Sequence, residues 1–173
     1  MLSLRQYKAC DAEIIEKWLR DEDVFNKWGG HLFGEYPINA KIIDDKYRLH
    51  NGDCTEADNF YPWVVFDETG KVVGHFIMRY LNGDRRLLRF GWVIVDDTVR
   101  GKGYGFQMLT LGLKYAFEIL GVDKVTLGVY ENNDQAHRCY QKVGFRDREL
   151  KPAEPWKVIE MEIEREAYLR HDV

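Results

Sequence analysis

A glycine-rich segment that follows a predicted strand is the part of the sequence best suited to bind an anion. Residues 90–95, FGWVIV, are rich in β-branched and aromatic side chains and predict a buried strand. Residues 100–105, RGKGYG, carry glycine at every second position, so backbone N–H groups can approach a ligand closely. A helix predicted to begin here adds the positive end of its dipole. The segment therefore predicts a site for phosphate groups.

The spacing of the glycines excludes two common nucleotide-binding loops. The chain has no GxxxxGK[ST] string, which a P-loop requires, and Phe106 stands where a dinucleotide-binding GxGxxG motif would have its last glycine. The remaining pattern, R-x-x-G-x-G, resembles the acyl-CoA pyrophosphate loop of the GNAT superfamily of N-acyltransferases.

A second motif strengthens this resemblance. Residues 133–145, NDQAHRCYQKVGF, match the family pattern N-x-x-A-x-x-x-Y-x-K-x-G-F at every fixed position. One helix and one strand would fill the distance between the two motifs. The sequence resembles the superfamily over residues 61–173 and more loosely over residues 1–60, and its pattern is most similar to the ribosomal-protein N-terminal acetyltransferase-like subgroup.

The resemblance implies a single α/β (α+β) domain of the GNAT type over residues 1–173. We expect a central mixed, mostly antiparallel twisted sheet of about six or seven strands flanked by about four or five helices, splayed between the strands at 87–95 and 124–130. Residues 1–60 would form the acceptor-side helices and loops, residues 61–145 the acetyl-CoA-binding core, and residues 146–173 a C-terminal strand region.

The same resemblance implies an acetyl-CoA-dependent N-acetyltransferase, in which a primary amine attacks the thioester directly within a ternary complex. The acceptor would be a small-molecule amine or a peptide N-terminus, and the protein a monomer or homodimer. Acetyl-CoA is the expected co-substrate, and no metal is expected. A non-catalytic acyl-CoA-binding or sensing module on the same fold is the alternative.

The residues expected to contact acetyl-CoA lie on the strand before the glycine loop, in the loop, and on the helix of the second motif. They are Val93, Ile94, Val95, Arg100, Gly101, Lys102, Gly103, Tyr104, Gly105, Asn133, Ala136 and Tyr140. In the family, pantetheine pairs with the strand backbone, and Gly91 suits the bulge that this needs, although close strand packing explains this glycine equally well.

Tyr140 is the predicted general acid. A phenol with a pKa of about 10 matches the basicity of a departing alkyl thiolate, so a neutral tyrosine can protonate the sulfur. Asn133 lies two helical turns earlier and shares the same helix face. The alternatives are a core aromatic beside Phe145 for Tyr140 and a helix N-cap for Asn133.

The general base is less clearly marked. Many relatives carry a glutamate on the strand before the loop, but Arg89 holds the aligned position here. Glu131 is the preferred carboxylate, followed by Asp96, His75 and His137, and a water chain would need no residue at all.

Aromatic side chains in the first sixty residues could hold the acceptor. Phe25, Trp28 and Phe33 are the candidates, and the alternative is that they belong to the core and cover the sheet.

Composition narrows the partners further. The net charge of −4, with both signs interspersed, argues against nucleic acid and is compatible with a cationic substrate. The sequence has no apolar run of membrane-spanning length and no signal-peptide pattern at its start, so we expect no membrane association and a cytoplasmic location. Three cysteines without metal-ligand spacing indicate neither a disulfide framework nor a zinc site.

Overall fold

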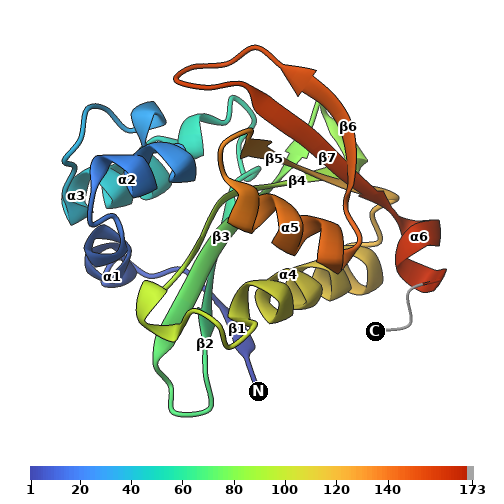
Figure 1. Ribbon diagram of the computed structural model, residues 1–173, viewed down its shortest axis with the longest axis horizontal. Coiled ribbons are helices and arrows are strands. Elements are labelled where there is room, and N and C mark those ends of the chain that lie inside the picture. The colour runs from blue at the N-terminus through green and yellow to red at the C-terminus, as the bar shows by residue number, and fades with distance from the viewer. Residues whose placement is uncertain (171–173) are drawn as a thin grey trace. The chain divides into compact units, whose positions relative to one another are not determined.

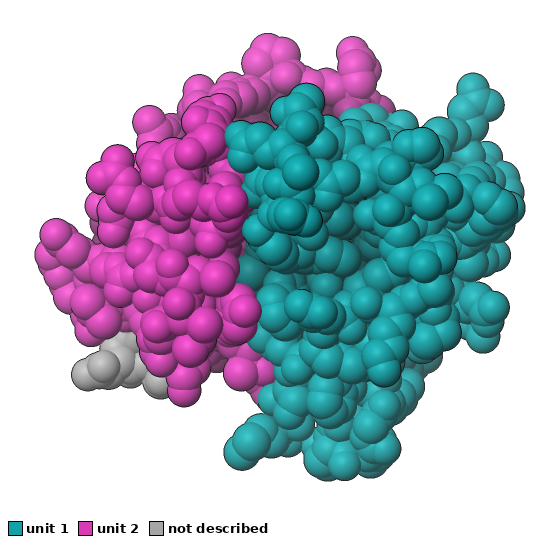
Figure 2. Space-filling model, turned by 180° about the vertical axis from the view of Figure 1, so that it is seen from behind, with its two compact units in different colours: residues 1–79, 92–104 teal, residues 80–91, 105–173 magenta. Residues whose placement is uncertain are grey.

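The computed structural model describes residues 1–170, and the chain divides into two compact units. Unit 1 comprises residues 1–79 and 92–104, and unit 2 comprises residues 80–91 and the chain from residue 105 onward (Figure 2). The division falls within β3 (Val72–Leu81) and β4 (Asp84–Val95), since each of these strands contributes residues to both units.

Seven strands form a mixed sheet in the order β1-β2-β3-β4-β5-β7-β6 (Figure 1). The remaining strands are β1 (Ser3–Gln6), β2 (Tyr61–Phe66), β5 (Lys124–Tyr130), β6 (Arg146–Lys151) and β7 (Val158–Glu164). β4 and β5 pair in parallel, whereas β1 with β2, β2 with β3, β5 with β7 and β6 with β7 pair antiparallel. The predicted mixed, mostly antiparallel sheet is confirmed.

Three helices of unit 1 follow β1, and two of them begin at a residue whose side chain caps the helix. The three are α1 (Asp11–Trp18), α2 (Glu22–Trp28) and α3 (Ala40–Asp44), and α3 continues into a wider π-helical turn, η2 (Asp45–Leu49). The Asp21 carboxylate accepts a hydrogen bond from the Val24 N–H (2.8 Å) and so caps α2, and Gly29, at φ +91°, ends it. Asn39 caps α3 in the same way.

These helices bury an apolar cluster together with β3. Its members are Ala12, Ile15, Trp18, Leu19, Phe25, Trp28, Ile38, Ile43, Tyr47 and Ile77, all buried. Ile15 and Ile43, from two different helices, are completely inaccessible to solvent, and α1 contacts α3 directly. The cluster fixes the helices of the first sixty residues as one packed layer of unit 1.

A buried histidine lies within this unit. The Nδ1 of His75 is 2.9 Å from the Trp63 carbonyl oxygen, which can only accept, so Nδ1 carries the proton and Nε2 accepts from the Tyr47 hydroxyl (2.8 Å). Burial lowers the pKa of His75 to about 4, against the hydrogen bond to Trp63, which favours the charged ring. His75 is therefore neutral at neutral pH.

We expect His75 to make the free energy of unfolding depend on pH between about 6.5 and about 4. The unfolded chain takes up a proton in this window before the folded chain does, so stability falls as the pH falls, by up to about 3 kcal/mol. Urea unfolding of the wild type and of His75→Gln across this range measures the effect. The difference between the two curves should shrink toward acid pH. A His75→Gln slope equal to that of the wild type would contradict the assignment.

In unit 2, β5 is paired along its whole length with β7 but only briefly with β4. All seven residues of β5 have partners on β7, whereas the parallel pairing covers three residue pairs, Leu87–Arg89 with Lys124–Thr126. The short parallel pairing agrees with the predicted splay. One face of β5 and β7 is apolar and buried, with Val125 and Met161 among its members.

The opposite face of β5 and β7 carries charge pairs. The Arg89 guanidinium binds both carboxylate oxygens of Glu160, at 2.7 and 3.1 Å, and reaches it across Gly128. A β-carbon at Gly128 would lie 2.9 Å from the Arg89 Nη2 and 2.9 Å from the Val158 Cγ1, so glycine makes room for the pair. The position where relatives carry a glutamate is thus occupied by a cation that is already paired.

The helices of unit 2 alternate with these strands along the chain. α4 (Tyr104–Lys114) begins at the last residue of unit 1, where the sequence predicts a helix to begin after the glycine-rich segment, and continues as a π-helical turn over η5 (Tyr115–Ile119). α5 (Asp134–Val143) is capped by Asn133 and ended by Gly144, at φ +115°. The short α6 (Arg165–Arg170) follows β7.

Two elements were not predicted from the sequence, β6 and α6. All six residues of β6, RDRELK, are exposed, so no apolar alternation marks this strand, and only its pairing with β7 defines it. α6 has six residues, none of them buried. Both lie in the predicted C-terminal strand region, whose residues 171–173 lie outside the described residues.

Candidate active site

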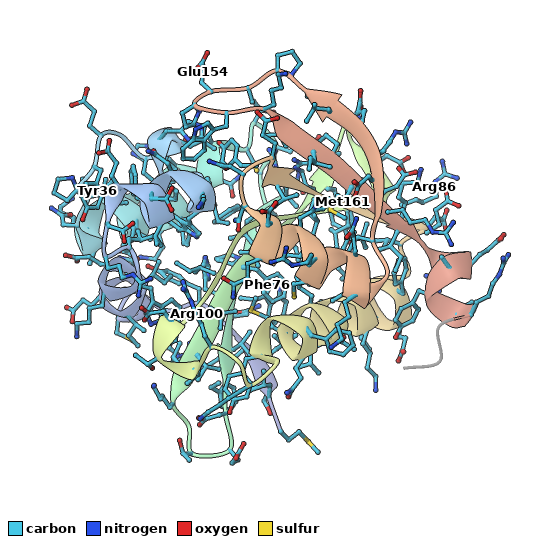
Figure 3. All side chains as sticks on the ribbon, in the orientation of Figure 1. Tyr36, Phe76, Arg86, Arg100, Glu154 and Met161 are labelled. Atoms are coloured by element: carbon cyan, nitrogen blue, oxygen red, sulfur yellow. The ribbon has the colours of Figure 1, made fainter. Side chains whose placement is uncertain are left out.

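The predicted phosphate loop is an exposed, left-handed turn of unit 1. Arg100, Gly101, Lys102 and Gly103 are all exposed, and Figure 3 marks Arg100 in this turn. Gly101 and Gly103 have φ of +81° and +70°, which glycine adopts without strain, and a β-carbon at either position would have no heavy atom within 4 Å. The loop therefore leaves open space beside its backbone, next to two cationic side chains and the N-terminus of α4.

A buried carboxylate orders the start of this loop. Asp96 is 4% exposed, its carboxylate accepts from the Thr98 N–H (2.9 Å), and it pairs with the Lys71 ammonium (2.9 Å). Burial alone would raise its pKa, but the bonds from Lys71 and Thr98 outweigh burial and lower the pKa of Asp96. The Asp96 carboxylate therefore already has hydrogen-bond partners, and it links the end of β4 to the turn η4 (Asp97–Val99).

The strand before the loop contains a backbone irregularity. Trp92 has φ +45°, a conformation that costs a bulky side chain on the order of 1–3 kcal/mol. Its carbonyl oxygen accepts a hydrogen bond from the Trp28 indole N–H (3.0 Å). In the sequence, Gly91 suited either a bulge or close strand packing, and the structure has the left-handed residue one position later, at Trp92. Val93, Ile94 and Val95, which follow it, are only half-buried.

In unit 2, the second motif forms α5 and its cap. The Asn133 side chain accepts a hydrogen bond from the Ala136 N–H (3.4 Å). Asn133 therefore caps α5, which was the alternative role considered for it from the sequence. Gly105 and Ala136 are half-buried.

Tyr140 is 7% exposed and its ring lies 6.4 Å from that of Phe145. No hydrogen bond to its hydroxyl is found in residues 1–170. Burial raises the pKa of Tyr140 well above its usual value, with the neighbouring Cys139 adding to the effect. The hydroxyl keeps its proton at neutral pH, as a general acid must.

The candidate bases lie in different surroundings. Glu131 directly follows β5 and its side chain is exposed. The His137 Nε2 lies 2.7 Å from an Asp147 carboxylate oxygen. His75 and Asp96 are buried and hydrogen-bonded as described above, which leaves Glu131 as the freely accessible carboxylate of the set.

Of the predicted acceptor-binding aromatics, Phe25 and Trp28 belong to the cluster of unit 1, and Phe33 packs against it. Phe25 is 1% exposed and Trp28 5% exposed, whereas Phe33 is half-buried. Trp28 and Phe33 stack with their ring centroids 4.7 Å apart, and Phe25 packs against Tyr36 at 5.5 Å. The structure brings Trp28 and Phe33 together, and contact with an acceptor stays a prediction.

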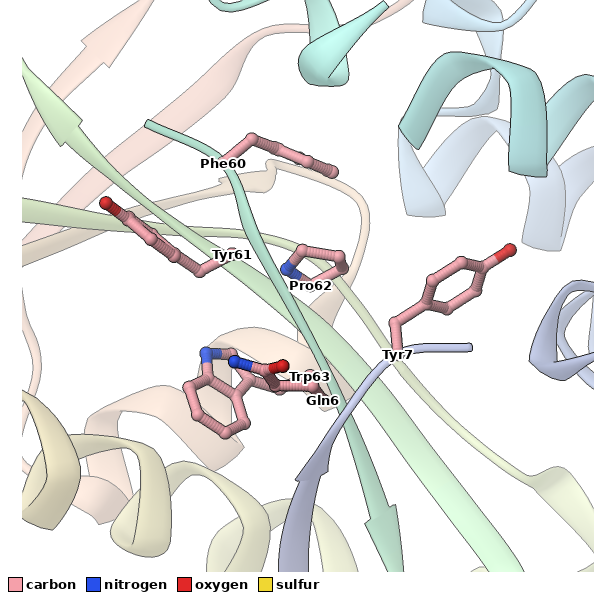
Figure 4. Close-up of a pocket in the computed structure, with 6 residues that line it drawn as sticks. All are labelled: Gln6, Tyr7, Phe60, Tyr61, Pro62 and Trp63. Atoms are coloured by element: carbon pink, nitrogen blue, oxygen red, sulfur yellow. The ribbon is translucent and has the colours of Figure 1, made fainter. Parts of the chain in front are cut away.

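A small pocket of unit 1 lies where β1 ends and β2 begins (Figure 4). Its volume is about 180 Å³, and its walls are Gln6, Tyr7, Phe60, Tyr61, Pro62 and Trp63. The sequence analysis singled out none of these residues for function, because aromatic residues at a strand start are typical of a core.

Residues 1–170 contain neither a cluster of metal ligands nor a membrane-spanning helix. No group of three or more His, Cys, Asp and Glu side chains could hold a metal ion there. Within the same residues, no helix combines the length and apolar character needed to cross a membrane.

Comparisons with known proteins identify the family. The acetyltransferase (GNAT) domain model matches residues 1–146. The SPbeta prophage-derived uncharacterized N-acetyltransferase YokL of Bacillus subtilis is 30% identical over 145 residues, which cover 83% of this chain and 75% of that protein. The spermine/spermidine N(1)-acetyltransferase of the same species is 35% identical over 97 residues, which cover 56% of this chain and 55% of that protein.

Solved structures share the fold. A spermidine N-acetyltransferase from Vibrio cholerae, in complex with CoA and spermine, superposes with a TM-score of 0.79 at 23% identity, covering 97% of this chain and 98% of that one. The aminoglycoside acetyltransferase AAC(6')-Ib, in complex with ribostamycin and coenzyme A, gives a TM-score of 0.81 at 18% identity, covering 99% of this chain and 98% of that one.

The chain belongs to the GNAT acetyltransferase family. The predictions of an N-acetyltransferase fold and of enzymatic acetyl transfer to an amine are confirmed at this level.

Gly101→Ala tests the glycine loop. We expect a loss of stability of about 1–2 kcal/mol, because alanine is strained at φ +81°, together with CoA binding weakened by about fivefold or more. Gly70→Ala is the matched control, since Gly70 has φ +84° and open space beside it but lies in the turn between β2 and β3. Urea unfolding and calorimetric titration with CoA measure both effects; equal CoA affinities for the two variants would contradict a role for the loop.

Proposed function

We propose that this enzyme acetylates a primary amine of a small cationic molecule, with the amine attacking acetyl-CoA directly in a ternary complex. The exposed glycine loop is the main support for cofactor binding. Its backbone, its two cationic side chains and the start of α4 together suit a pyrophosphate group. We assign the acceptor side to residues 1–60 and the acetyl-CoA-binding core to residues 61–145.

The cofactor contacts that we propose follow the two motifs. The backbone of residues 93–95 would pair with the pantetheine amides, since these residues are half-buried and follow a left-handed position that interrupts the strand. Residues 100–105 would bind the pyrophosphate. Asn133 and Ala136, at the start of α5, would contact the pantetheine arm.

Tyr140 is the general acid in this proposal. The amine nitrogen attacks the thioester carbonyl carbon, the carbon–sulfur bond breaks, and the Tyr140 hydroxyl gives its proton to the leaving sulfur. The attacking nitrogen loses a proton to Glu131, directly or through water. Support comes from the buried, neutral phenol and from the exposed carboxylate at the end of β5.

The charge of the chain supports a cationic acceptor. Residues 1–60 contain twelve Asp and Glu against eight Lys and Arg, whereas the rest of the chain contains seventeen of each. The net charge of −4 is therefore confined to the expected acceptor side. Relatives named for spermine and spermidine, and structural neighbours titled for aminoglycosides, also act on cationic amines.

Other predictions rank behind this acceptor class. A peptide N-terminus, as in the ribosomal-protein N-terminal acetyltransferase-like subgroup, is the second acceptor to test. A monomer or homodimer and a cytoplasmic location stay predictions from the sequence.

Tyr140→Phe distinguishes catalysis from the alternative of a non-catalytic acyl-CoA-binding module. We expect kcat to fall on the order of 100-fold, because the sulfur loses its proton donor, while the Kd for CoA stays within about twofold. Tyr168→Phe, which loses only a hydroxyl contact to Glu118 on the surface of unit 2, is the control and should keep wild-type turnover. A binding module would show CoA affinity and no turnover in any of these proteins, and unchanged turnover in Tyr140→Phe would remove the acid role.

A screen that detects released CoA thiol over several amines tests the acceptor class. We expect polyamines and aminoglycosides to be turned over faster than neutral amines or peptide N-termini, and raised salt to weaken the preference, because screening reduces the attraction of the negative acceptor side. A preference for neutral amines at low salt would contradict the proposal.

A further inference from the structure

We propose that Trp28 is a positioning residue for acetyl-CoA binding, because its indole N–H holds the left-handed backbone at Trp92 and so sets the strand segment that follows. The inference rests on the proposed cofactor role of residues 93–95 and assigns Trp28, predicted from the sequence to contact the acceptor, a different task. All residues involved lie in unit 1.

The hydrogen bond from Trp28 meets a specific need of β4. A residue with φ +45° turns its peptide groups out of the regular strand pattern, and a polar group that loses its ladder partner away from water needs another one. The Trp28 Nε1 lies 3.0 Å from the Trp92 carbonyl oxygen and donates a hydrogen bond to it at this irregular position. Because the indole N–H can only donate and the carbonyl oxygen can only accept, the direction of this hydrogen bond is fixed.

Packing restricts the Trp92 ring as well. The centroids of Phe33, Tyr47 and Phe60 lie 4.7, 5.6 and 5.9 Å from that of Trp92. A β-carbon at Gly29 would lie 3.3 Å from two atoms of the Trp92 ring, so the glycine that ends α2 also allows this close approach. The ring is enclosed by residues that come from the first sixty positions of the chain.

The enclosing wall is itself fixed. Tyr47, which stacks on Trp92 with an interplanar angle of 23°, donates its hydroxyl proton to His75, and His75 donates to the Trp63 carbonyl. The Trp28 ring stacks on Phe33 with an interplanar angle of 18°. Side chains held in this way cannot follow a relaxation of Trp92, so the hydrogen bond keeps the strand in one conformation.

This arrangement couples the two substrates of the proposed reaction. The end of α2 lies on the expected acceptor side, and the strand it holds carries the proposed pantetheine contacts. A variant of Trp28 should therefore change the affinity for CoA without removing any group that touches CoA.

Trp28→Phe is the direct test, because phenylalanine keeps an aromatic ring and lacks the N–H. We expect the Kd for CoA, measured by calorimetric titration, to rise about five- to tenfold, and the amide protons of residues 93–95 to exchange faster with solvent. Trp18→Phe is the matched control: Trp18 is 7% exposed in the same cluster, and among the described residues it has neither a ring contact nor a hydrogen bond to Trp92. It should lose stability with an unchanged Kd and unchanged exchange at residues 93–95.

Two further measurements separate the hydrogen bond from general packing. Phe33→Leu removes a ring that stacks on Trp28 and lies tilted against Trp92 but leaves the bond, so its Kd for CoA should rise less than that of Trp28→Phe. In the wild type, the Trp28 indole proton should exchange as slowly as core amides, and this needs no variant that might fail to fold. The inference would be overturned if Trp28→Phe and Trp18→Phe changed the Kd for CoA and the exchange of residues 93–95 equally, or if the Trp28 indole proton exchanged rapidly. A wild type that does not bind CoA would instead refute the proposed function. In that case the exchange of the Trp28 indole proton would still test the hydrogen bond.

Discussion

The conformation of β4 depends on one hydrogen bond to a backbone carbonyl oxygen within the strand. At Trp92 the backbone of β4 leaves the extended conformation, and its carbonyl oxygen accepts a hydrogen bond from the indole of Trp28. The aromatic cluster of unit 1 is therefore more than a core, because it stabilises an irregularity that the proposed chemistry uses.

The two motifs could be predicted from the sequence because each combines local backbone needs with a fixed spacing. Glycines at positions 101 and 103 are required by their positive φ, and Asn133 and Gly144 begin and end α5 as their residue types indicate. The exposed strand β6 was missed because its pattern is polar throughout, and its existence follows from pairing with β7. Long-range pairing of this kind leaves no local periodicity.

The side-chain contacts of the site were harder to predict than its backbone. Nothing in the local sequence relates Trp28 to Trp92, which lie 64 positions apart, so an aromatic residue near the expected acceptor side was assigned to the acceptor. Similarly, Arg89 was recognised as a departure from the family, but its pairing with Glu160 across Gly128 depends on the register of three strands. Such contacts require tertiary structure.

The uneven charge of the chain affects how fast substrates arrive as well as how tightly they bind. With all excess negative charge in the first sixty residues, a polycation diffusing nearby experiences a field that directs it toward that part of the surface, and encounter accelerates at low ionic strength. The cationic glycine loop, with Arg100 and Lys102, attracts the oppositely charged diphosphate in the same manner. Under the proposed function, electrostatic steering would therefore attract the cationic acceptor and the anionic cofactor to differently charged segments of the chain before either makes a contact.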